Sequence, residues 1–329
     1  MSLFYNQDTA CFDIVIVGGG MVGACLAALL GEAAQSSPPL AALKIGLLES
    51  NSLDAPWQEG FDPRVSALTV ASQRVLESVG AWELMKTHRV SPFRVMDVWD
   101  AEGTGSIQFY AEELAEVRLG HIVENRVIQK SLIQRCREYS QIEILCPEQL
   151  VRIEKTTAEV SLLLGSDRVV QTKLLVGADG ANSFVRNHLN FSLRVRDYHH
   201  DAIVTTVKTE KPHQATAWQR FTPSGPIAFL PLSSDREEHD GHYCSLVWST
   251  LPEEARGLLE RTDEAFCEAL TLAFEERLGR VEWCDKRYSY ALKQRHVAHY
   301  IQDNIALIGD AAHTIHPLAG QGVNLGFMD

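Results

Sequence analysis

The sequence predicts an α/β fold with a parallel sheet that is built from both ends of the chain. A second, largely antiparallel sheet is inserted between these two ends. Near the N-terminus, residues 12–17 form an unbroken apolar run, and residues 21–30 are mostly small and apolar. Near the C-terminus, residues 305–308 form another apolar run, which ends at Gly309. From about Tyr198 onward, short apolar or alternating segments between turns replace the alternation of strands and helices.

The first elements form a βαβ unit, with a strand at 12–17, a helix at 21–30 and a second strand at 44–49. Residues 69–79 carry a helical pattern that ends at Gly80. The other elements expected before residue 190 are a β-hairpin (95–99 and 106–110), a helix (127–139) and strands at 142–145, 150–154, 160–164 and 174–176.

The antiparallel part is expected to hold strands at 202–208, 217–221, 227–232 and 243–249. A helix is predicted over 262–278, because Thr262 is a good N-cap and acidic residues fill the first turn. The expected domain division is a discontinuous parallel-sheet domain (1–90, 118–190 and 288–329) and an inserted domain (91–117 and 191–287).

Charge and cysteine content exclude several function classes. The net charge of −13 argues against a nucleic-acid partner, which needs clustered Lys and Arg, and provides no polybasic segment for an anionic membrane. The seven cysteines are scattered, with no C-x-x-C spacing, which is typical of reduced thiols in a cytoplasmic protein rather than of a disulfide or zinc framework.

Residues 14–31 carry no charge, over a length close to that of a membrane span. Asp13 precedes this run, no basic segment introduces it, and several glycines interrupt it. We therefore expect a buried strand, turn and helix here, rather than a signal peptide or a transmembrane segment.

The first glycine motif, Gly18-x-Gly20-x-x-Gly23, follows a predicted strand and opens a predicted helix. In this context Gly18 permits a tight turn, Gly20 lets the backbone approach a pyrophosphate, and Gly23 lets helix and strand pack closely. Glu49 ends the second strand, where its carboxylate can accept hydrogen bonds from a ribose and would repel a 2′-phosphate. The motif alone does not separate NAD from FAD, and a glycine-rich turn without a ligand is the competing interpretation.

Three further polar positions are candidates for the same site. Asp179 lies in a Gly-Ala-Asp-Gly turn between a strand and a helix, where it could also serve only as a helix cap. Arg64, which with Ser66 is expected to begin a helix, could neutralise a pyrophosphate or hold a flavin edge, or form a surface salt bridge. Gln129 lies on a helix face that could reach the cofactor.

The C-terminal motif follows the apolar run 305–308 and places Asp310, a Pro/Gly loop and the start of a helix in succession. This layout suits a hydroxyl-bearing ligand held at the carboxyl end of a strand, against helix N–H groups. Together with the Gly18 site at the other end of the chain, it indicates one long cofactor.

The Gly18 motif, the Gly-Ala-Asp-Gly turn at Asp179 and the C-terminal motif at Asp310 occur in the order and spacing of the class A flavoprotein aromatic hydroxylases. The chain resembles this family over essentially its whole length. The runs Arg64-Val-Ser-Ala-Leu, Leu119-Gly-His-Ile-Val-Glu-Asn125, Ala228-Phe-Leu-Pro-Leu and the segment from His313 to Gly326 are similar to the ubiquinone-biosynthesis hydroxylases. Within that subgroup the chain most resembles the hydroxylases that act on ring C5 of 2-polyprenylphenols; hydroxylases of other ring positions share most of these motifs.

The resemblance implies a Rossmann-like FAD-binding domain with an inserted substrate domain, FAD as cofactor and NAD(P)H as co-substrate. It implies that the reduced flavin traps O₂ as a C4a-hydroperoxide, so that no catalytic side chain is assigned. Cofactor binding is then expected from Gly18, Gly20, Gly23, Glu49, Arg64, Gln129, Asp179, Asp310, Gly320, Gly322, Val323 and Asn324. Among these, the resemblance assigns Asp310 to the ribityl chain, and it places the helix N-terminus from Gly320 to Asn324 beside the flavin pyrimidine ring, where N–H groups stabilise reduced flavin.

The substrate-pocket candidates are Phe221, Phe229, Leu232 and Pro317, although aromatic strand residues more often belong to a core. His313 and His316, like His199 and His200, are expected to be structural, and no ligand set for a metal is found. The expected partners are a polyprenylphenol, O₂, and other ubiquinone-biosynthesis proteins or a lipid carrier. The expected location is the cytoplasm, at the periphery of the inner membrane.

Two alternatives stay open. Relatives continue with further helices beyond the position of Asp329, so we expect a truncated hydroxylase, and an inactive flavin-binding scaffold within a biosynthetic assembly is the second interpretation. An NAD-dependent dehydrogenase is the third, disfavoured because it leaves the C-terminal motif without a role.

Overall fold

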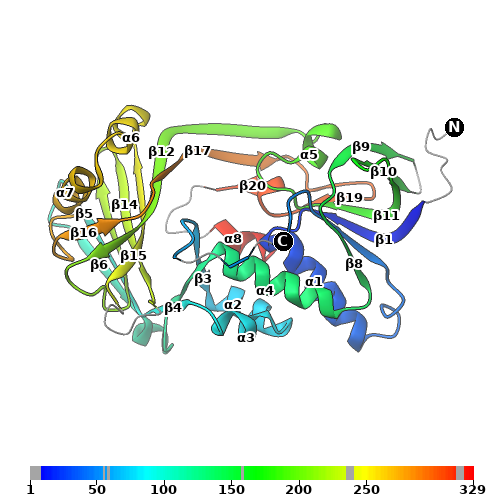
Figure 1. Cartoon of the computed structure of the whole chain (residues 1–329), viewed down its shortest axis with the longest axis horizontal. Helices are drawn as coiled ribbons and strands as arrows, with labels where there is room; N and C mark the ends of the chain where they lie inside the picture. The colour runs from blue at the N-terminus through cyan, green and yellow to red at the C-terminus, as the bar shows by residue number, and fades with distance from the viewer. Residues whose placement is uncertain (1–8, 55, 58–59, 157–158, 235–240, 316–321) are drawn as a thin grey trace.

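Two large sheets lie at opposite ends of the molecule, and a small sheet with several helices lies between them (Figure 1). The computed structural model describes the chain except for residues 1–8, 55, 58–59, 157–158, 235–240 and 316–321. The α/β class expected from the sequence is confirmed.

The first sheet is built from both ends of the chain, as predicted. Its order is β18-β19-β11-β1-β2-β8, and β9 and β10 extend it through β11. The parallel strands are β1 (Ala10–Val17), β2 (Ile45–Leu48), β8 (Ile142–Leu145), β11 (Val169–Gly177) and β19 (Ile305–Leu307). The antiparallel strands are β9 (Leu150–Lys155), β10 (Val160–Leu164) and β18 (Ile301–Gln302).

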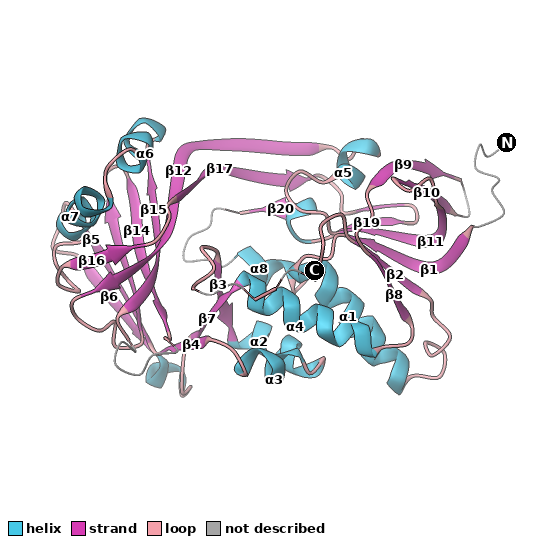
Figure 2. Ribbon diagram, viewed as in Figure 1, coloured by secondary structure: helices cyan, strands magenta, loops and turns pink. Residues whose placement is uncertain are grey.

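Two long helices, α1 (Met21–Ser36) and α4 (Asn125–Glu138), pack together against this sheet (Figure 2). Each helix contributes one apolar side to a core that includes Ile16 and Leu47 of the sheet. Because the core of the sheet is apolar on both sides, its strands are near-continuous apolar runs rather than alternating ones.

The small sheet contains β3 (Val65–Thr69), β7 (Gly120–Glu124) and β4 (Val90–Phe93), all antiparallel. The prediction that a helix begins at Arg64 and Ser66 is wrong, because Arg64 directly precedes β3 and Ser66 lies within it. Helix α2 (Val70–Ser78) begins only after Thr69, whose hydroxyl accepts a hydrogen bond from Ser72 N. Helix α3 (Ala81–Lys86) follows after Gly80, which adopts the left-handed conformation.

The second large sheet is antiparallel except where β13 pairs with β5. Its strands are β5 (Val95–Asp100), β6 (Ser106–Tyr110), β12 (Leu193–Thr209), β13 (Thr216–Thr222), β14 (Gly225–Leu232), β15 (Tyr243–Thr250), β16 (Val281–Cys284), β17 (Tyr288–Val297) and β20 (His313–Thr314). Helices α6 (Pro252–Leu259) and α7 (Asp263–Ala273) pack on one face of it. Helix α7 ends five residues earlier than predicted.

Strands β12 and β17 form a long ribbon that joins the two ends of the molecule (Figure 1). Their pairing runs from Leu193 with Val297 to Val204 with Tyr288, with a shift in register between Asp197 and Asp201, and the boundaries expected at residues 191 and 288 lie at its two ends. The short elements that complete the described chain are the 3₁₀ helices Ala111–Leu114 and Gly309–Ala311, α5 (Phe184–His188) and α8 (Gly322–Gly326).

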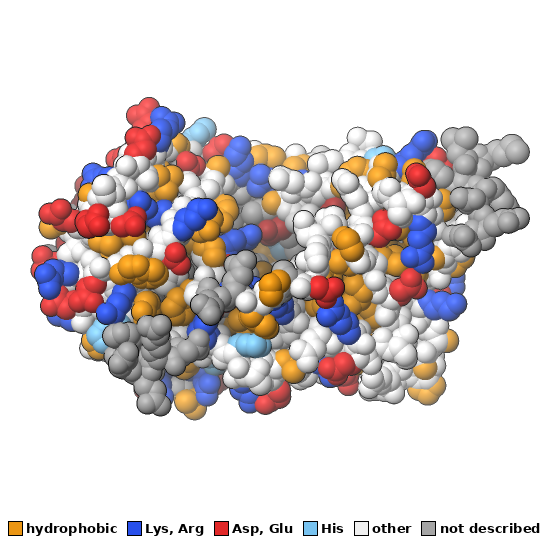
Figure 3. All heavy atoms as spheres, viewed as in Figure 1, with side chains coloured by type: hydrophobic (Ala, Val, Ile, Leu, Met, Phe, Trp, Pro, Cys, Tyr) orange, Lys and Arg blue, Asp and Glu red, His pale blue; other side chains and the backbone are white. Residues whose placement is uncertain are grey.

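The uncharged run 14–31 forms the end of β1 and most of α1. Among the helices that the structure describes, none combines the length and apolar character that a membrane span requires. On the face shown in Figure 3, acidic and basic side chains are interspersed over the surface.

Candidate functional site

A deep cleft of about 870 Å³ opens at the carboxyl ends of β1, β2 and β11. This volume lies within the range of roughly 300–1,000 Å³ typical of cofactor pockets. The structure brings six predicted site residues to the walls of the cleft: Gly18, Gly20, Glu49, Arg64, Gln129 and Asp179.

The glycine turn at the start of α1 explains its three glycines separately. Gly18 has φ +110°, and a Cβ there would lie 2.3 Å from the Ala178 carbonyl oxygen. A Cβ on Gly23 would lie 2.0 Å from the carbonyl oxygen of Gly18, so this glycine is required by packing. Gly20 has open space around it, and no side chain caps the helix that it begins. The first N–H groups of α1 therefore remain available to an anion such as a pyrophosphate.

Glu49 and Gln129 hold this turn from two sides. Glu49 Oε2 accepts a hydrogen bond from Gly19 N at 2.8 Å, and its Oε1 accepts one from Asn51 N at 2.8 Å. Gln129 Nε2 donates to the carbonyl oxygen of Gly19 at 2.8 Å. Both side chains therefore stabilise the glycine turn through hydrogen bonds to Gly19, in addition to lining the cleft.

Asp179 lines the cleft and has one carboxylate oxygen without a hydrogen-bond partner among the described residues. Its Oδ2 accepts a hydrogen bond from Val185 N at 3.1 Å, whereas Ser183 caps α5 by accepting one from Arg186 N. The other oxygen, Oδ1, is buried without a hydrogen-bond partner among the described residues. A buried acceptor of this kind fits a hydroxyl-bearing ligand better than a capping role alone.

Asp310 does not line the cleft, but it is close enough to Arg64 for their charges to interact. The crowded surroundings of Asp310 raise its pKa above that of a free aspartate even though the side chain reaches solvent, while the positive charges of Arg64 and His313 oppose this rise. The guanidinium of Arg64 lies 5.8 Å from the centre of the Tyr290 ring, within the range of a cation–π contact. No sequence pattern indicated a role for Tyr290.

The C-terminal motif is described only in part. Gly320 and Pro317, like His316, lie outside the described residues. Gly322 begins α8, and Val323 is buried in the core. The side chain of Asn324 binds β3 and α2 through Thr69 N, Ser72 Oγ and the Ala67 carbonyl oxygen, so it holds α8 in place.

The histidines are placed in structural contacts. His313 is buried, and its Nε2 lies 2.7 Å from Asp329 Oδ1. His200 Nδ1 contacts the Tyr198 carbonyl oxygen at 2.9 Å. Within the described part of the chain, no three His, Cys, Asp or Glu side chains are grouped as a metal ion would require.

A second cavity, of about 270 Å³, is almost entirely apolar. It lies between β3, β7 and β4 on one side and β5, β6, β13 and β14 on the other. Its lining residues are Ala67, Leu68, Thr69, Phe93, Met96, Phe109, Leu114, Leu119, Ile122, Ala217 and Leu230. Because Asn324 binds both Ala67 and Thr69, the cavity adjoins the end of the site that carries α8.

None of the described substrate-pocket candidates from the sequence, Phe221, Phe229 and Leu232, is among the residues that line this cavity. Phe229 does not line this cavity, because its side chain is fully buried against Phe274 on the other side of the sheet, with ring centres 4.0 Å apart. Successive residues of a strand face opposite sides, so Leu230 lines the cavity instead. Leu232 packs in the cluster beside it, and Phe221 is exposed without lining it.

Two cations of the cleft were missed by sequence reasoning, Arg126 and Lys130 of α4. They were detectable, since residues 126, 129, 130 and 133 share one helix face and all four line the cleft.

A family model described as an FAD binding domain matches residues 11–329. The ubiquinone biosynthesis monooxygenase COQ6 of Xenopus tropicalis is 36% identical over 98% of this chain and 77% of its own length. The 3-demethoxyubiquinol 3-hydroxylase of Escherichia coli is 37% identical over 98% and 78%, respectively.

Solved structures match the fold at lower identity. PqsL of Pseudomonas aeruginosa, in complex with 2-aminobenzoylacetate, superposes with a TM-score of 0.79 at 22% identity, over 96% of this chain and 83% of the other. The p-nitrophenol 4-monooxygenase PnpA of Pseudomonas putida gives 0.74 at 18%, over 98% and 78%.

Proposed function

We propose that this chain, which belongs to the FAD-binding domain family and is an FAD-dependent monooxygenase, hydroxylates the aromatic ring of a polyprenylphenol in ubiquinone biosynthesis. The proposed co-substrates are NAD(P)H and O₂. The observation that carries the proposal is that one short segment lines both hollows: residues 62–64 line the polar cleft, and residues 67–69 of β3 line the apolar cavity. A dinucleotide suits the first, and a phenol with an apolar tail suits the second.

The residues of the cleft fit FAD along its length. The uncapped N-terminus of α1 would bind the pyrophosphate, with Arg64 neutralising its charge. Glu49 would accept hydrogen bonds from the adenosine ribose, and Asp179 Oδ1 offers an unused buried acceptor to a further hydroxyl. Asp310 would bind the ribityl chain.

FAD, when bound, supplies the redox and oxygen chemistry. The tasks left to this chain are to position the phenol ring, to exclude water and to supply a favourable electrostatic field. The apolar cavity provides few polar groups that could hold water beside the ring. We assign no general base, since the proposed chemistry requires none from the side chains.

The test begins with the purified protein, FAD and a visible spectrum. We expect flavin bands after FAD addition, and then faster NAD(P)H oxidation when a 2-polyprenylphenol is added, with a product that has gained one oxygen atom by mass spectrometry. Absence of bound flavin would contradict the proposal. Bound flavin without substrate-stimulated oxidation would instead favour the flavin-binding scaffold.

The same assay identifies the substrate class. A phenol that lacks the prenyl tail should have a higher KM than its long-tailed counterpart, because it leaves the apolar cavity empty. Equal KM values for the two would remove the support that the cavity gives. Mass-spectrometric fragmentation of the product would then identify the ring position.

A further inference from the structure

In the run Leu119–Asn125, Leu119 and Ile122 line the apolar cavity, whereas Gly120, Glu124 and Asn125 make contacts that neither the cofactor nor the substrate explains. A Cβ on Gly120 would lie 2.4 Å from the carbonyl oxygen of Leu68, so β7 and β3 approach closely here. Asn125 Oδ1 accepts a hydrogen bond from Ser66 Oγ at 2.7 Å, and Asn125 N donates to the Arg64 carbonyl oxygen at 2.9 Å. This end of β7 therefore fixes the start of β3, where Arg64 lies.

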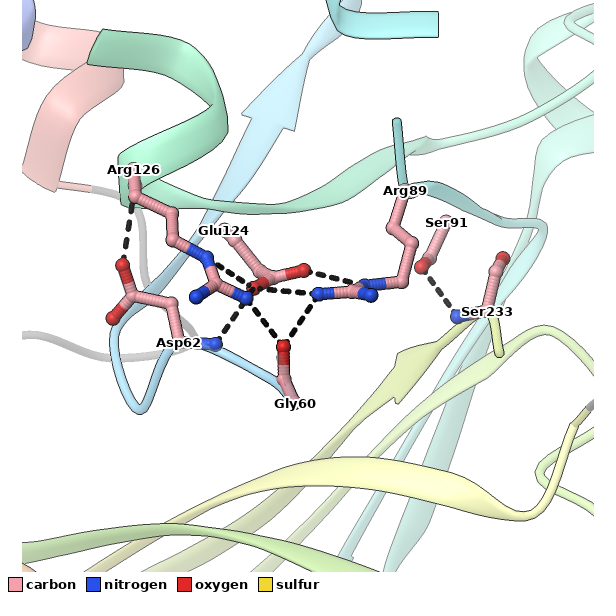
Figure 4. Close-up of polar contacts among 7 residues, drawn as sticks. All are labelled: Gly60, Asp62, Arg89, Ser91, Glu124, Arg126 and Ser233. Atoms are coloured by element: carbon pink, nitrogen blue, oxygen red, sulfur yellow. Dashed lines mark hydrogen bonds and ion pairs between the residues drawn. The ribbon is translucent and has the colours of Figure 1, made fainter. Parts of the chain in front are cut away.

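Glu124, at the end of β7, is a buried carboxylate with only 1% of its side chain exposed. Its Oε1 accepts a hydrogen bond from Arg89 Nε at 2.8 Å, and its Oε2 accepts one from Arg126 Nη2 at 2.7 Å. Oε2 also accepts from Asp62 N at 2.6 Å (Figure 4). One carboxylate thus joins two arginines from different elements to the loop that precedes β3.

The two arginines also bind this loop directly. Arg89 Nη2 donates to the Gly60 carbonyl oxygen at 2.7 Å, and Arg126 Nη2 donates to the same oxygen (Figure 4). The guanidinium of Arg89 lies 4.7 Å from the centre of the Phe61 ring. Consequently, residues 60 and 61 are held by groups that depend on Glu124 for their own placement.

Asp62 connects this cluster to Arg64 through hydrogen bonds. Its Oδ2 accepts a hydrogen bond from Arg126 N at 3.2 Å, and its Oδ1 accepts one from Arg64 N at 2.9 Å. With its carbonyl bound to Asn125 N, Arg64 has both backbone groups fixed while its side chain is exposed in the cleft. A cation held this way is preorganised for an anion.

A buried ion cluster is weak evidence for stability, because desolvation offsets most of its Coulombic attraction and an apolar cluster often serves as well. Five contacts from Glu124, Arg89 and Arg126 converge on the loop before a cleft residue, and they call for another role. We propose that Glu124, together with Arg89, is a positioning residue that holds loop 60–64 so that Arg64 meets the pyrophosphate of FAD. This inference rests on the proposed binding of FAD.

The test uses Glu124→Gln and Arg89→Lys, which keep side-chain size but remove the carboxylate charge or the forked donor. Arg89 is not among the residues that line the cleft, so any effect on FAD must pass through the loop. We expect each variant to raise the Kd for FAD, measured by quenching of flavin fluorescence, about tenfold. Glu275→Gln, which removes a carboxylate partner of Arg220 far from the cleft, should lower the melting temperature without changing this Kd.

A double-mutant cycle with Arg64→Ala separates positioning from general stability. If Glu124 acts through Arg64, then Arg64→Ala should weaken FAD binding strongly in the wild-type background and much less in the Glu124→Gln background. Fully additive effects, or an unchanged Kd beside a lowered melting temperature, would overturn the inference. If Glu124→Gln does not fold, Arg89→Lys decides by the same criteria. Failure of the wild-type protein to bind FAD would instead contradict the proposed function.

Discussion

The side-chain oxygen of Asn324 accepts a hydrogen bond from the Ser72 hydroxyl at 2.7 Å, which joins residues 252 positions apart in the chain. The same oxygen accepts a hydrogen bond from Thr69 N at 3.0 Å, and the amide nitrogen of Asn324 donates to the Ala67 carbonyl oxygen at 2.7 Å. One amide therefore fixes α8 to the strand that lines the apolar cavity.

Asn324→Ala should destabilise the protein by about 1–3 kcal/mol, because it removes three hydrogen bonds, of which those to Ser72 and Ala67 are partly buried. Urea unfolding of the apo protein, followed by tryptophan fluorescence, measures this free energy. Asn187→Ala, at an exposed position of α5, is the control and should change it little. A loss at position 324 no larger than that of the control would refute the role of Asn324.

Gly23→Ala and Gly20→Ala should separate packing from ligand binding. An alanine Cβ at position 23 would lie 2.0 Å from the Gly18 carbonyl oxygen, so we expect a loss of about 1–3 kcal/mol in the free energy of unfolding. Around Gly20 the space is open, so Gly20→Ala should alter stability by no more than about 0.5 kcal/mol. It should nevertheless weaken FAD binding, because the methyl group would enter the cleft. The opposite ranking in a thermal melt would contradict the assignment.

Asp310→Ala should raise the Kd for FAD by about 5- to 150-fold, which corresponds to losing about 1–3 kcal/mol from an acceptor for ribityl hydroxyls. Equilibrium titration with FAD measures this change. Glu268→Ala, at an exposed position of α7, removes a carboxylate away from the cleft and should leave the Kd unchanged. A wild-type Kd for Asp310→Ala would exclude the proposed contact.

Ala217→Phe should fill the apolar cavity and raise the KM for a long-tailed phenol about tenfold or more, with FAD affinity unchanged. Phe229→Leu provides the matched control, since Phe229 faces the opposite side of the sheet. It should lower stability without affecting KM. The reverse pattern would restore Phe229 as a pocket residue.

His121 should make the protein less stable in mild acid. Burial, followed by the charge of Arg118, lowers the pKa of His121 to about 4, from 6.5 for the free side chain. The unfolded chain then binds a proton that the folded chain rejects, so stability is complete above pH 6.5 and is lost as the pH falls toward 4.

Between pH 8 and pH 5 this single group should remove about 2 kcal/mol of unfolding free energy. Urea midpoints of the wild type and His121→Gln at both pH values measure the difference. His121→Gln should show a smaller pH dependence than the wild type, whereas His199→Gln, at an exposed position, should not. Parallel pH profiles for all three proteins would refute a neutral, buried His121.

Local sequence patterns predicted most of the elements because their signals are short-ranged. The glycine turn and the Thr262 helix start are examples, since each depends on the conformation of a few consecutive residues. The helix expected at Arg64 failed for the opposite reason. Residues 65–69 form a strand because β7 offers a pairing edge, and that edge comes from a segment more than fifty residues later.

The polar cleft could also be predicted to a large extent, because motifs at the ends of parallel strands meet at one edge of the sheet. Glu49, Gln129 and Asp179 all line it, while Arg126 and Lys130 were missed despite sharing a helix face with Gln129. The apolar cavity could not be predicted, since apolar strand residues look the same whether they face a core or a cavity.

By itself, the sequence determined the α/β class, the two-ended parallel sheet and the family of flavoprotein hydroxylases, because motif spacing and strand periodicity are properties of the chain. Only the tertiary structure decided that Leu230 rather than Phe229 lines the cavity, and that Glu124 joins Arg89 and Arg126 around loop 60–64. Alternation along a strand fixes which residues share a face. Which face packs against the neighbouring sheet, and which buried charges form ion pairs, depends on packing between segments far apart in sequence.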